Sequence, residues 1–164
     1  LPRAAMGQVD LGVDAPDVLI VQGEATLWRE ALSNLLDNAL RHCPPGGQVT
    51  AHAALEPAVP ESGPPQHTAR WVLSVSNPAQ LVDPALLTVL NQTGDQAQRF
   101  VRGEGATQGG AGLGLAIARR IAERQGGQLQ VTQSADGVFR ACLSWPVSEA
   151  FTAQGLSLSE LKGN

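Results

Sequence analysis

One segment constrains the fold more than any other: residues 26–42, TLWREALSNLLDNALRH. Its apolar residues recur at intervals of three and four, which predicts an amphipathic helix with one buried face. These apolar residues are Leu27, Ala31, Leu32, Leu35, Leu36, Ala39 and Leu40. The sequence Pro-Pro-Gly-Gly at 44–47 cannot continue a helix, so we expect this one to end near Cys43.

A second, polar stripe runs along the same predicted helix. Glu30, Asn34 and Asn38 lie four residues apart, and Arg41 and His42 extend the line by one more turn. Asparagine is a poor helix former because its short amide competes for backbone hydrogen bonds, and each one inside a helix costs roughly a few tenths of a kcal/mol. The stripe is either a solvated surface with two neutral asparagines or a binding surface, and the helix alone leaves both interpretations open.

The composition fits one globular domain. The chain has 164 residues, of which 43% are hydrophobic and 16% are charged, which allows a proper core and argues against disorder. We assign residues 1–164 to a single domain, with a core over about 8–147 and a C-terminal tail over 148–164. The net charge of -4 and the lack of a basic block argue against a nucleic-acid binder. Cys43 and Cys142 show no zinc-site spacing and predict two reduced thiols in a cytosolic setting.

The sequence also bears on membranes and on the extent of the chain. No apolar run approaches the roughly 18 residues that a membrane-spanning helix needs, and we find no signal peptide. The chain opens LPRAAMGQ rather than with a methionine. We therefore expect a fragment of a longer protein, and the lack of a membrane segment in it says nothing about the parent.

Alternating or continuous apolar residues predict strands in the first half of the chain. The pattern at 9–13 predicts an edge strand, and the run DVLIVQG at 17–23 predicts a second short strand or a strand-like lead-in to the helix. The segments 48–56 and 69–77 predict two partner strands. The stretch between them, 57–68, is rich in proline and glycine and is expected to be an exposed hairpin loop.

The second half predicts two further helices. Asp83 followed by Pro84 opens a short helix that runs to Asn91, in the preferred order of N-cap and then proline. Residues 95–102 fit one or two more helical turns. A strongly helical pattern, LAIARRIAERQ, follows at 115–125 and ends at a Gly-Gly pair.

A β-hairpin closes the predicted domain. Residues 128–134 and 138–145 have strand patterns and are joined by Ala135-Asp136-Gly137, a turn of the glycine type. Helices and antiparallel hairpins therefore alternate, which predicts an α/β fold: a two-layer α/β sandwich with a mixed, mostly antiparallel sheet of about five strands on about three helices.

The glycine-rich segment 103–115, GEGATQGGAGLGL, runs directly into a predicted helix. Glycine allows close approach of a ligand, and a helix start offers unpaired N–H groups and a positive dipole end to phosphate. A flexible loop before a helix is the alternative. A P-loop is excluded because no lysine precedes Lys162, and a dinucleotide fingerprint fails because its third glycine position is Ile117.

Three motifs together resemble the ATP-binding catalytic domain of sensor histidine kinases. They are NLLDNALRH at 34–42, RFVRGEG at 99–105 and GGAGLGLAIARRIAERQGG at 109–127. That domain belongs to a wider group shared with gyrase, the heat-shock chaperone ATPases and the mismatch-repair ATPases. The resemblance covers roughly residues 8–147 and implies the Bergerat-type ATP-binding fold, which is the sandwich already predicted from the pattern.

The resemblance implies roles for the polar stripe, with ATP and Mg²⁺ as cofactors. Asn38 matches the asparagine whose side-chain oxygen ligates Mg²⁺, and Asn34 matches one that lies near the phosphates. Arg41 matches a phosphate contact, and His42 matches a residue that flanks the nucleotide. In the gyrase branch a glutamate base occupies the position of Asn34; an amide cannot deprotonate water, which fits transfer to a protein acceptor.

The glycine-rich region supplies the other implied contacts. Arg102 resembles the arginine before the lid that reaches the γ-phosphate, and Phe100 resembles the lid's hydrophobic anchor. The residues implied to surround the phosphates at the lid end and helix start are Gly110, Gly112, Leu113, Gly114 and Leu115.

One motif departs from the family pattern. The usual DxGxG reads Asn77-Pro78-Ala79-Gln80-Leu81 here. Asn77 can accept a hydrogen bond from the adenine amino group, but without charge, so the bond should be weaker. Ala79 adds a methyl group to the base pocket, and Leu81 completes the expected base contacts. A plain strand-ending turn is the alternative interpretation of Asn77-Pro78.

The phosphoacceptor is not recognisable in this chain. His42, His52 and His67 lack the sequence context of the family's acceptor histidine. The resemblance therefore implies a protein-histidine kinase domain that donates the γ-phosphoryl group of ATP to a histidine-bearing dimerisation domain of the same full-length protein, which then serves a response regulator. We expect a cytoplasmic location, as the cytosolic portion of an inner-membrane receptor, without direct membrane contact by this fragment. The alternatives are an anti-sigma-type serine kinase or an ATPase of the same group, or a non-catalytic module with weakened nucleotide binding.

Overall fold

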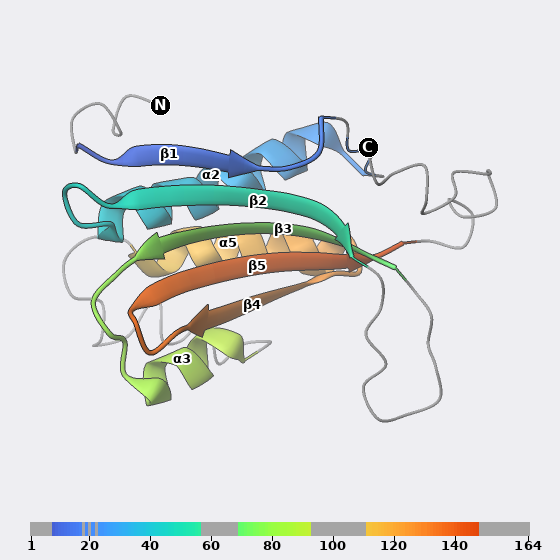
Figure 1. Ribbon diagram of the computed structural model, residues 1–164. Coiled ribbons are helices and arrows are strands. Elements are labelled where there is room, and N and C mark those ends of the chain that lie inside the picture. Colours follow the sequence, from blue (N-terminus) through green and yellow to red (C-terminus); the bar gives the residue numbers. More distant parts are fainter. Residues whose placement is uncertain are drawn as a thin grey trace.

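The computed structural model describes residues 8–17, 19, 21, 23–56, 69–92 and 111–147. The strands are β1 (Asp10–Asp14), β2 (Gln48–Glu56), β3 (Arg70–Pro78), β4 (Gln128–Gln133) and β5 (Val138–Pro146). The helices are α2 (Ala25–His42), α3 (Pro84–Asn91) and α5 (Ala111–Arg124). The strands form one sheet in the order β1-β2-β3-β5-β4, and α2 and α5 lie side by side on one face of it (Figure 1). The predicted two-layer α/β sandwich is confirmed.

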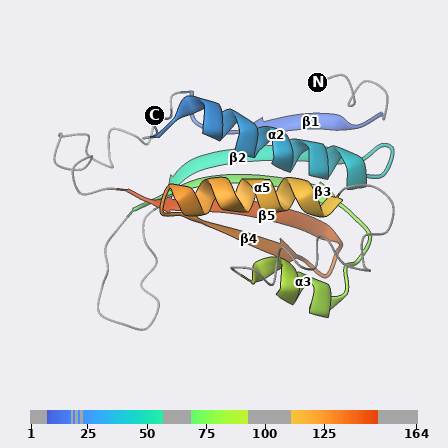
Figure 2. The same ribbon diagram turned by 180° about the vertical axis from the view of Figure 1, so that it is seen from behind.

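The sheet is mixed in the way the pattern predicted. β1 is parallel to β2, whereas β2, β3, β5 and β4 pair antiparallel with their neighbours. Seen from behind, α2 and α5 cover the middle of the sheet, and α3 lies beside β4 at its edge (Figure 2). Alternate residues of the central strands, such as Val75 opposite Ala141 and Trp71 opposite Trp145, belong to the core under the helices.

The apolar face of α2 is narrower than predicted. Ala31, Leu35 and Ala39 are buried, and Asn38 is buried with them. The remaining leucines of the face, Leu27, Leu32, Leu36 and Leu40, are only partly buried. Because α2 contacts both β3 and α5, one edge of the polar stripe is covered by the neighbouring helix rather than exposed to solvent.

Of the two alternatives for 17–23, a second short strand or a strand-like lead-in to the helix, the described residues fit the lead-in. The described residues of that stretch, 17, 19, 21 and 23, lie outside any strand. Leu19 and Val21 instead pack against the core while partly exposed. The place beside β2 is already taken by β1, so the apolar run serves as the connection into α2, and Gly23 adopts a φ of 135° just before the helix.

Helix α5 begins at Ala111, four residues earlier than predicted, so Gly112 and Gly114 lie inside its first turns rather than in the preceding loop. Its predicted glycine end is confirmed. The N–H of Gly127 donates to Ala122 O and that of Gly126 donates to Glu123 O, at 2.9 and 3.1 Å. With Gly126 at a φ of 74°, this is a Schellman motif.

Two local predictions about turns and caps are also confirmed. The Asp83 carboxylate accepts a 2.8 Å hydrogen bond from the Ala85 N–H and caps α3, with Pro84 in the first turn. β4 and β5 form the predicted hairpin, and Gly137 in its turn has a φ of 87°. The expected loop at 57–68, the extra helical turns at 95–102 and the tail at 148–164 lie outside the described residues.

Candidate functional site

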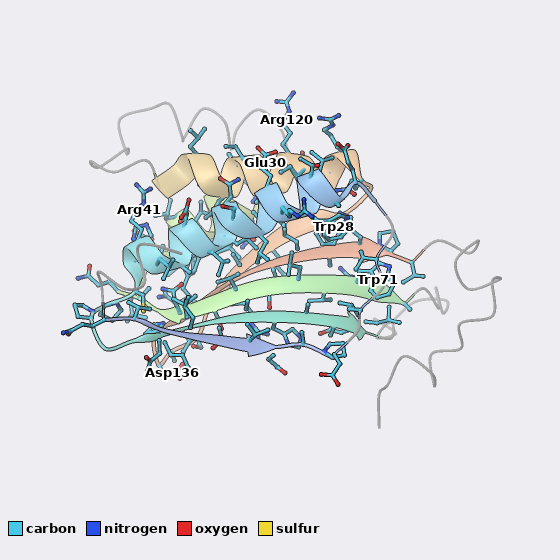
Figure 3. All side chains as sticks on the ribbon, turned by 90° about the horizontal axis from the view of Figure 1, so that it is seen from above. Trp28, Glu30, Arg41, Trp71, Arg120 and Asp136 are labelled. Atoms are coloured by element: carbon cyan, nitrogen blue, oxygen red, sulfur yellow. The ribbon has the colours of Figure 1, made fainter. Side chains whose placement is uncertain are left out.

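The first turns of α5 meet the polar stripe of α2 at Gly114. A Cβ atom at Gly114 would lie 3.3 Å from the Asn34 carbonyl oxygen and 3.4 Å from Asn34 Oδ1. A glycine therefore allows the two helices to approach at this point. Figure 3 shows the C-terminal end of α2, marked by Arg41, on the same side of the molecule as the start of α5. The structure thus brings one residue of the stripe, Asn34, against one residue of the glycine-rich helix start, Gly114.

The carboxamide of Asn34 is oriented by its own helix. Its Nδ2 donates to the carbonyl oxygen of Glu30 at 2.8 Å, which leaves Oδ1 on the side where Gly114 lies. The first four N–H groups of a helix have no acceptor within it, and its dipole makes this end positive. Asn34 thus contributes a neutral oxygen next to a region that favours anions.

Asn38 lies one turn further along the stripe and is 8% exposed. Within the part of the chain that the structure describes, its carboxamide has no hydrogen-bond partner. The side-chain atoms of Asn38 are not among the fully buried N and O atoms without a partner in the described part of the chain, so its carboxamide remains accessible to water or a ligand. The position therefore suits an oxygen ligand for a cation better than it suits a residue kept for packing.

The end of α2 adds two exposed side chains, Arg41 and His42. Burial lowers the pKa of His42 from its ordinary value, and the nearby Arg41 cation lowers this pKa further. His42 is therefore neutral at pH 7, and the positive charge at this end of α2 comes from Arg41.

The C-terminal end of β3 brings a second group of predicted residues to the helix-covered side of the sheet. Asn77 is 2% exposed and pairs with the core residue Phe139 in register. Its Nδ2 donates to Pro78 O at 2.8 Å, so the assigned carboxamide keeps its oxygen as the acceptor. The backbone N–H of Ala79 donates to Gly137 O at 2.9 Å. The strand runs through Pro78, so Asn77 is a buried strand residue and not part of a turn.

The segment after β3, residues 79–82, is held in place by Gln133, a residue that the sequence analysis did not single out. Gln133, at the end of β4, accepts from the Val82 N–H at 2.7 Å and donates to Gln80 O at 3.0 Å. Between these two bonds the Leu81 side chain is 72% exposed. No sequence signal marks Gln133, because it lies in an ordinary strand pattern and its partners are 51 and 53 residues away.

The predicted residues of α5 differ in their surroundings. Leu113 is 59% exposed, whereas Leu115 is 6% exposed and belongs to the core. Leu115 could therefore face a ligand only with its backbone. Gly112 is placed in the helix by its backbone. Phe100, Arg102 and Gly110 lie outside the described residues.

Metal binding by a cluster of acidic, histidine or cysteine side chains has no basis in the part of the chain that the structure describes, because it contains no group of three such residues. A hard cation here would rely on amide oxygens, phosphates and water. Nor is any helix of that part long and apolar enough to cross a bilayer.

Comparison with known proteins gives one family. Residues 23–149 match the family described as histidine kinase-, DNA gyrase B-, and HSP90-like ATPase. The swarming motility regulation sensor protein RssA of Serratia marcescens is 31% identical over 145 residues, which cover 83% of this chain and 26% of RssA. Sensor protein QseC of Salmonella typhimurium is 35% identical over 139 residues, which cover 84% of this chain and 26% of QseC. The chain thus spans about a quarter of the length of these relatives.

A solved structure shares the fold. The catalytic domain of histidine kinase ThkA superposes with a TM-score of 0.63 at 18% identity, over 88% of this chain and 84% of that one. Its helices and strands support the sandwich architecture alone, because the identity is low. With the family match covering most of the sequence, the chain belongs to the histidine kinase-, DNA gyrase B-, and HSP90-like ATPase family.

Proposed function

We propose that this domain binds Mg-ATP between the polar stripe of α2 and the start of α5, and donates the γ-phosphoryl group to a histidine on a separate dimerisation domain. The observation that carries the proposal is the close packing of Gly114 against Asn34, where an added Cβ atom would lie only 3.3–3.4 Å from the two oxygens of Asn34. It brings amide oxygens and a positive helix end to one place, as a metal-bound triphosphate requires. Family membership supports the same ligand.

The residues present fit a magnesium ion. Asn38 offers an amide oxygen that no described residue occupies, and Mg²⁺ prefers one or two protein oxygens together with phosphates and waters. Asn38 is therefore the proposed ligand. Bound Mg²⁺ would neutralise charge on the phosphates.

The proposed chemistry is positioning and charge neutralisation. Arg41 would contact phosphate from the end of α2, and Arg102 would do so from the connection before α5. Asn34 cannot remove a proton from water, which favours transfer to a histidine over hydrolysis. Holding the γ-phosphate in line with an incoming histidine converts a bimolecular encounter into an oriented step.

The nucleobase would lie near the end of β3. Asn77 presents a carboxamide oxygen that can accept from the adenine amino group, and its own Nδ2 is already satisfied by Pro78 O. Ala79, Leu81 and His42 would border the base. The neutral acceptor should bind adenine more weakly than a carboxylate would.

The proposed partners follow from the relatives, which are sensor proteins about four times as long as the matched region. In the full-length protein the histidine-bearing domain would receive the phosphoryl group and pass it to a response regulator. The domain would then work on the cytoplasmic side.

The test is a phosphoryl-transfer assay with γ-labelled Mg-ATP, this domain and its separately produced histidine-bearing domain. The proposal predicts label on histidine, recognisable because a phosphoramidate is labile in acid and stable in base. Label on serine would favour the anti-sigma type of kinase, and free phosphate would favour an ATPase. No transfer, with no nucleotide binding at millimolar ATP, would favour a non-catalytic module.

A further inference from the structure

A buried arginine of α5, Arg119, binds the end of another helix. Arg119 is 8% exposed, and its guanidinium donates to the carbonyl oxygens of Leu90 and Gln92. Gln92 is the C-cap of α3, so the guanidinium lies where the last carbonyls of that helix lack donors and its dipole is negative. Burial lowers the pKa of Arg119 and the neighbouring Glu123 opposes this, but arginine keeps its charge in proteins. Arg119 is thus a charged clamp on α3.

Helix α3 depends on such polar contacts because it contributes little to the core. None of its residues is buried, and Leu87 and Leu90 pack against the core while partly exposed. A second clamp comes from Asn91, whose Nδ2 donates to Val131 O and whose Oδ1 accepts from the Val131 N–H, both at 2.7 Å. The end of α3 is therefore fixed to β4 through Asn91 and to α5 through Arg119.

The clamp joins the two sides of the proposed nucleotide site. On α5, Arg119 follows Gly114, where an added Cβ atom would press on Asn34, by little more than one turn. Helix α3 follows directly from the base-side segment that ends in Leu81. Gln133 holds this segment at β4, so a displacement of α3 relative to α5 would strain that attachment and shift the base side relative to the phosphate side.

We propose that Arg119 is a positioning residue for the nucleotide: by holding the C-terminal carbonyls of α3, it sets the spacing between the segment Asn77–Leu81 and the start of α5. This inference rests on the proposed function. Its effect passes through α3 and not through contact with ATP. Arg119→Met removes all the donors, whereas Arg119→Lys keeps the charge and loses the two-pronged geometry. Arg120 is the matched control, because it is the next arginine on α5 and points away from the sheet at the exposed surface (Figure 3).

The first measurement is the Kd for Mg-ATP of each variant, well below its unfolding temperature, with the folded state checked by circular dichroism. We expect Arg119→Met to weaken binding about tenfold, the order that hydrogen bonds to a charged group support. Arg119→Lys should lie between Arg119→Met and the wild type, and Arg120→Met should equal the wild type. Should Arg119→Met fail to fold, the lysine variant carries the test.

The second measurement is hydrogen exchange of the peptide covering 84–92. We expect faster exchange in Arg119→Met and no change in the peptides of β3 and β5. If Arg119→Met binds Mg-ATP as tightly as Arg120→Met does, the inference is wrong, whether or not α3 exchanges faster. Unchanged hydrogen exchange in α3 of Arg119→Met would also overturn it. If the wild type does not bind Mg-ATP, both the proposed function and this inference are refuted. If the wild type and Arg119→Met bind Mg-ATP equally tightly, only this inference is refuted.

Discussion

At the scale of single residues, the proposed site depends on side chains that make few contacts with the rest of the protein. Asn34 is oriented by one hydrogen bond to Glu30 O, and Gly114 leaves just enough space for it. Asn38 is largely buried without a protein partner in the described part of the chain. Groups arranged in this way make few contacts that hold the fold together and remain available to a ligand. Substitutions here should therefore separate binding from stability.

Gly114→Ala is the sharpest such case. The added methyl group would press on Asn34 at 3.3–3.4 Å, which opposes a gain of about 0.5–1 kcal/mol from replacing glycine in a helix. We expect the free energy of unfolding, measured with urea, to change by less than about 1 kcal/mol. The affinity for Mg-ATP should nevertheless fall, because Asn34 must move. Unchanged affinity would show that Asn34 does not contribute to the site.

His42 predicts a pH dependence of stability. Its pKa in the folded protein lies below 6.5 because of burial and the Arg41 charge, so the unfolded state binds the proton more readily. The contribution of neutral His42 is complete above about pH 6.5 and is lost as pH falls below it. Urea unfolding at pH 7.5 and pH 5.5 should therefore show a larger loss on acidification for the wild type than for His42→Gln. Equal losses would mean that the histidine is not perturbed.

At the scale of elements, the C-terminal end of α5 separates two roles of glycine. Gly126 has a φ of 74° and nothing within 4 Å of an added Cβ, whereas a Cβ on Gly127 would lie 2.3 Å from Trp145 Cδ1 and 2.5 Å from Ser144 O. Gly126 is therefore needed for its backbone conformation and Gly127 for space.

We expect Gly126→Ala to cost about 1 kcal/mol, the ordinary penalty of a left-handed conformation. Gly127→Ala should cost more, about 3 kcal/mol, because the strand backbone and a buried indole would have to move. Urea unfolding of both variants measures the two losses in free energy of unfolding. A larger loss for Gly126→Ala than for Gly127→Ala would contradict the observed C-terminal end of α5.

At the scale of the whole molecule, the proposed nucleotide site lies at one end of the sandwich and a stabilising aromatic contact lies at the other. Arg41 marks the end of α2 at the proposed site, and Trp28 marks the opposite end (Figure 3). There Trp28 packs on Trp145 with ring centroids 4.0 Å apart, which joins the helix layer to the sheet. Among the described residues, neither indole N–H has a hydrogen-bond partner, although both are buried, and this cost partly offsets the packing.

This division predicts the behaviour of Trp28→Phe. The variant should lose about 1 kcal/mol of stability, less than the roughly 3–5 kcal/mol of a truncation to alanine, because it removes an unpaired N–H as well as packing. Its Kd for Mg-ATP should match that of the wild type. A weaker Kd measured at a temperature where the variant is fully folded would contradict the separation of the two ends.

Much of this arrangement could be predicted from the sequence, because it follows from local periodicity and caps. The alternation in 48–56 and 69–77, the Asp83 cap and the glycine end of α5 are all local signals. The pattern at 17–23 left a strand and a lead-in to the helix open, because competition for the edge of the sheet, which β1 occupies, is a tertiary matter. The Gln133 and Arg119 bonds were missed because each depends on a partner far away in the chain. The early start of α5 was missed because the helix extends into glycine-rich sequence, where intrinsic helix propensity is low.

A calorimetric titration of the wild type and Asn38→Ala with Mg-ATP shows whether the stripe of α2 and the start of α5 hold one metal-bound triphosphate between them. We expect saturable binding by the wild type and loss of that binding in Asn38→Ala, whose urea unfolding should stay close to that of the wild type because Asn38 has no hydrogen-bond partner among the described residues. Equal affinity of the two proteins for Mg-ATP would exclude Asn38 as a ligand and with it the proposed site.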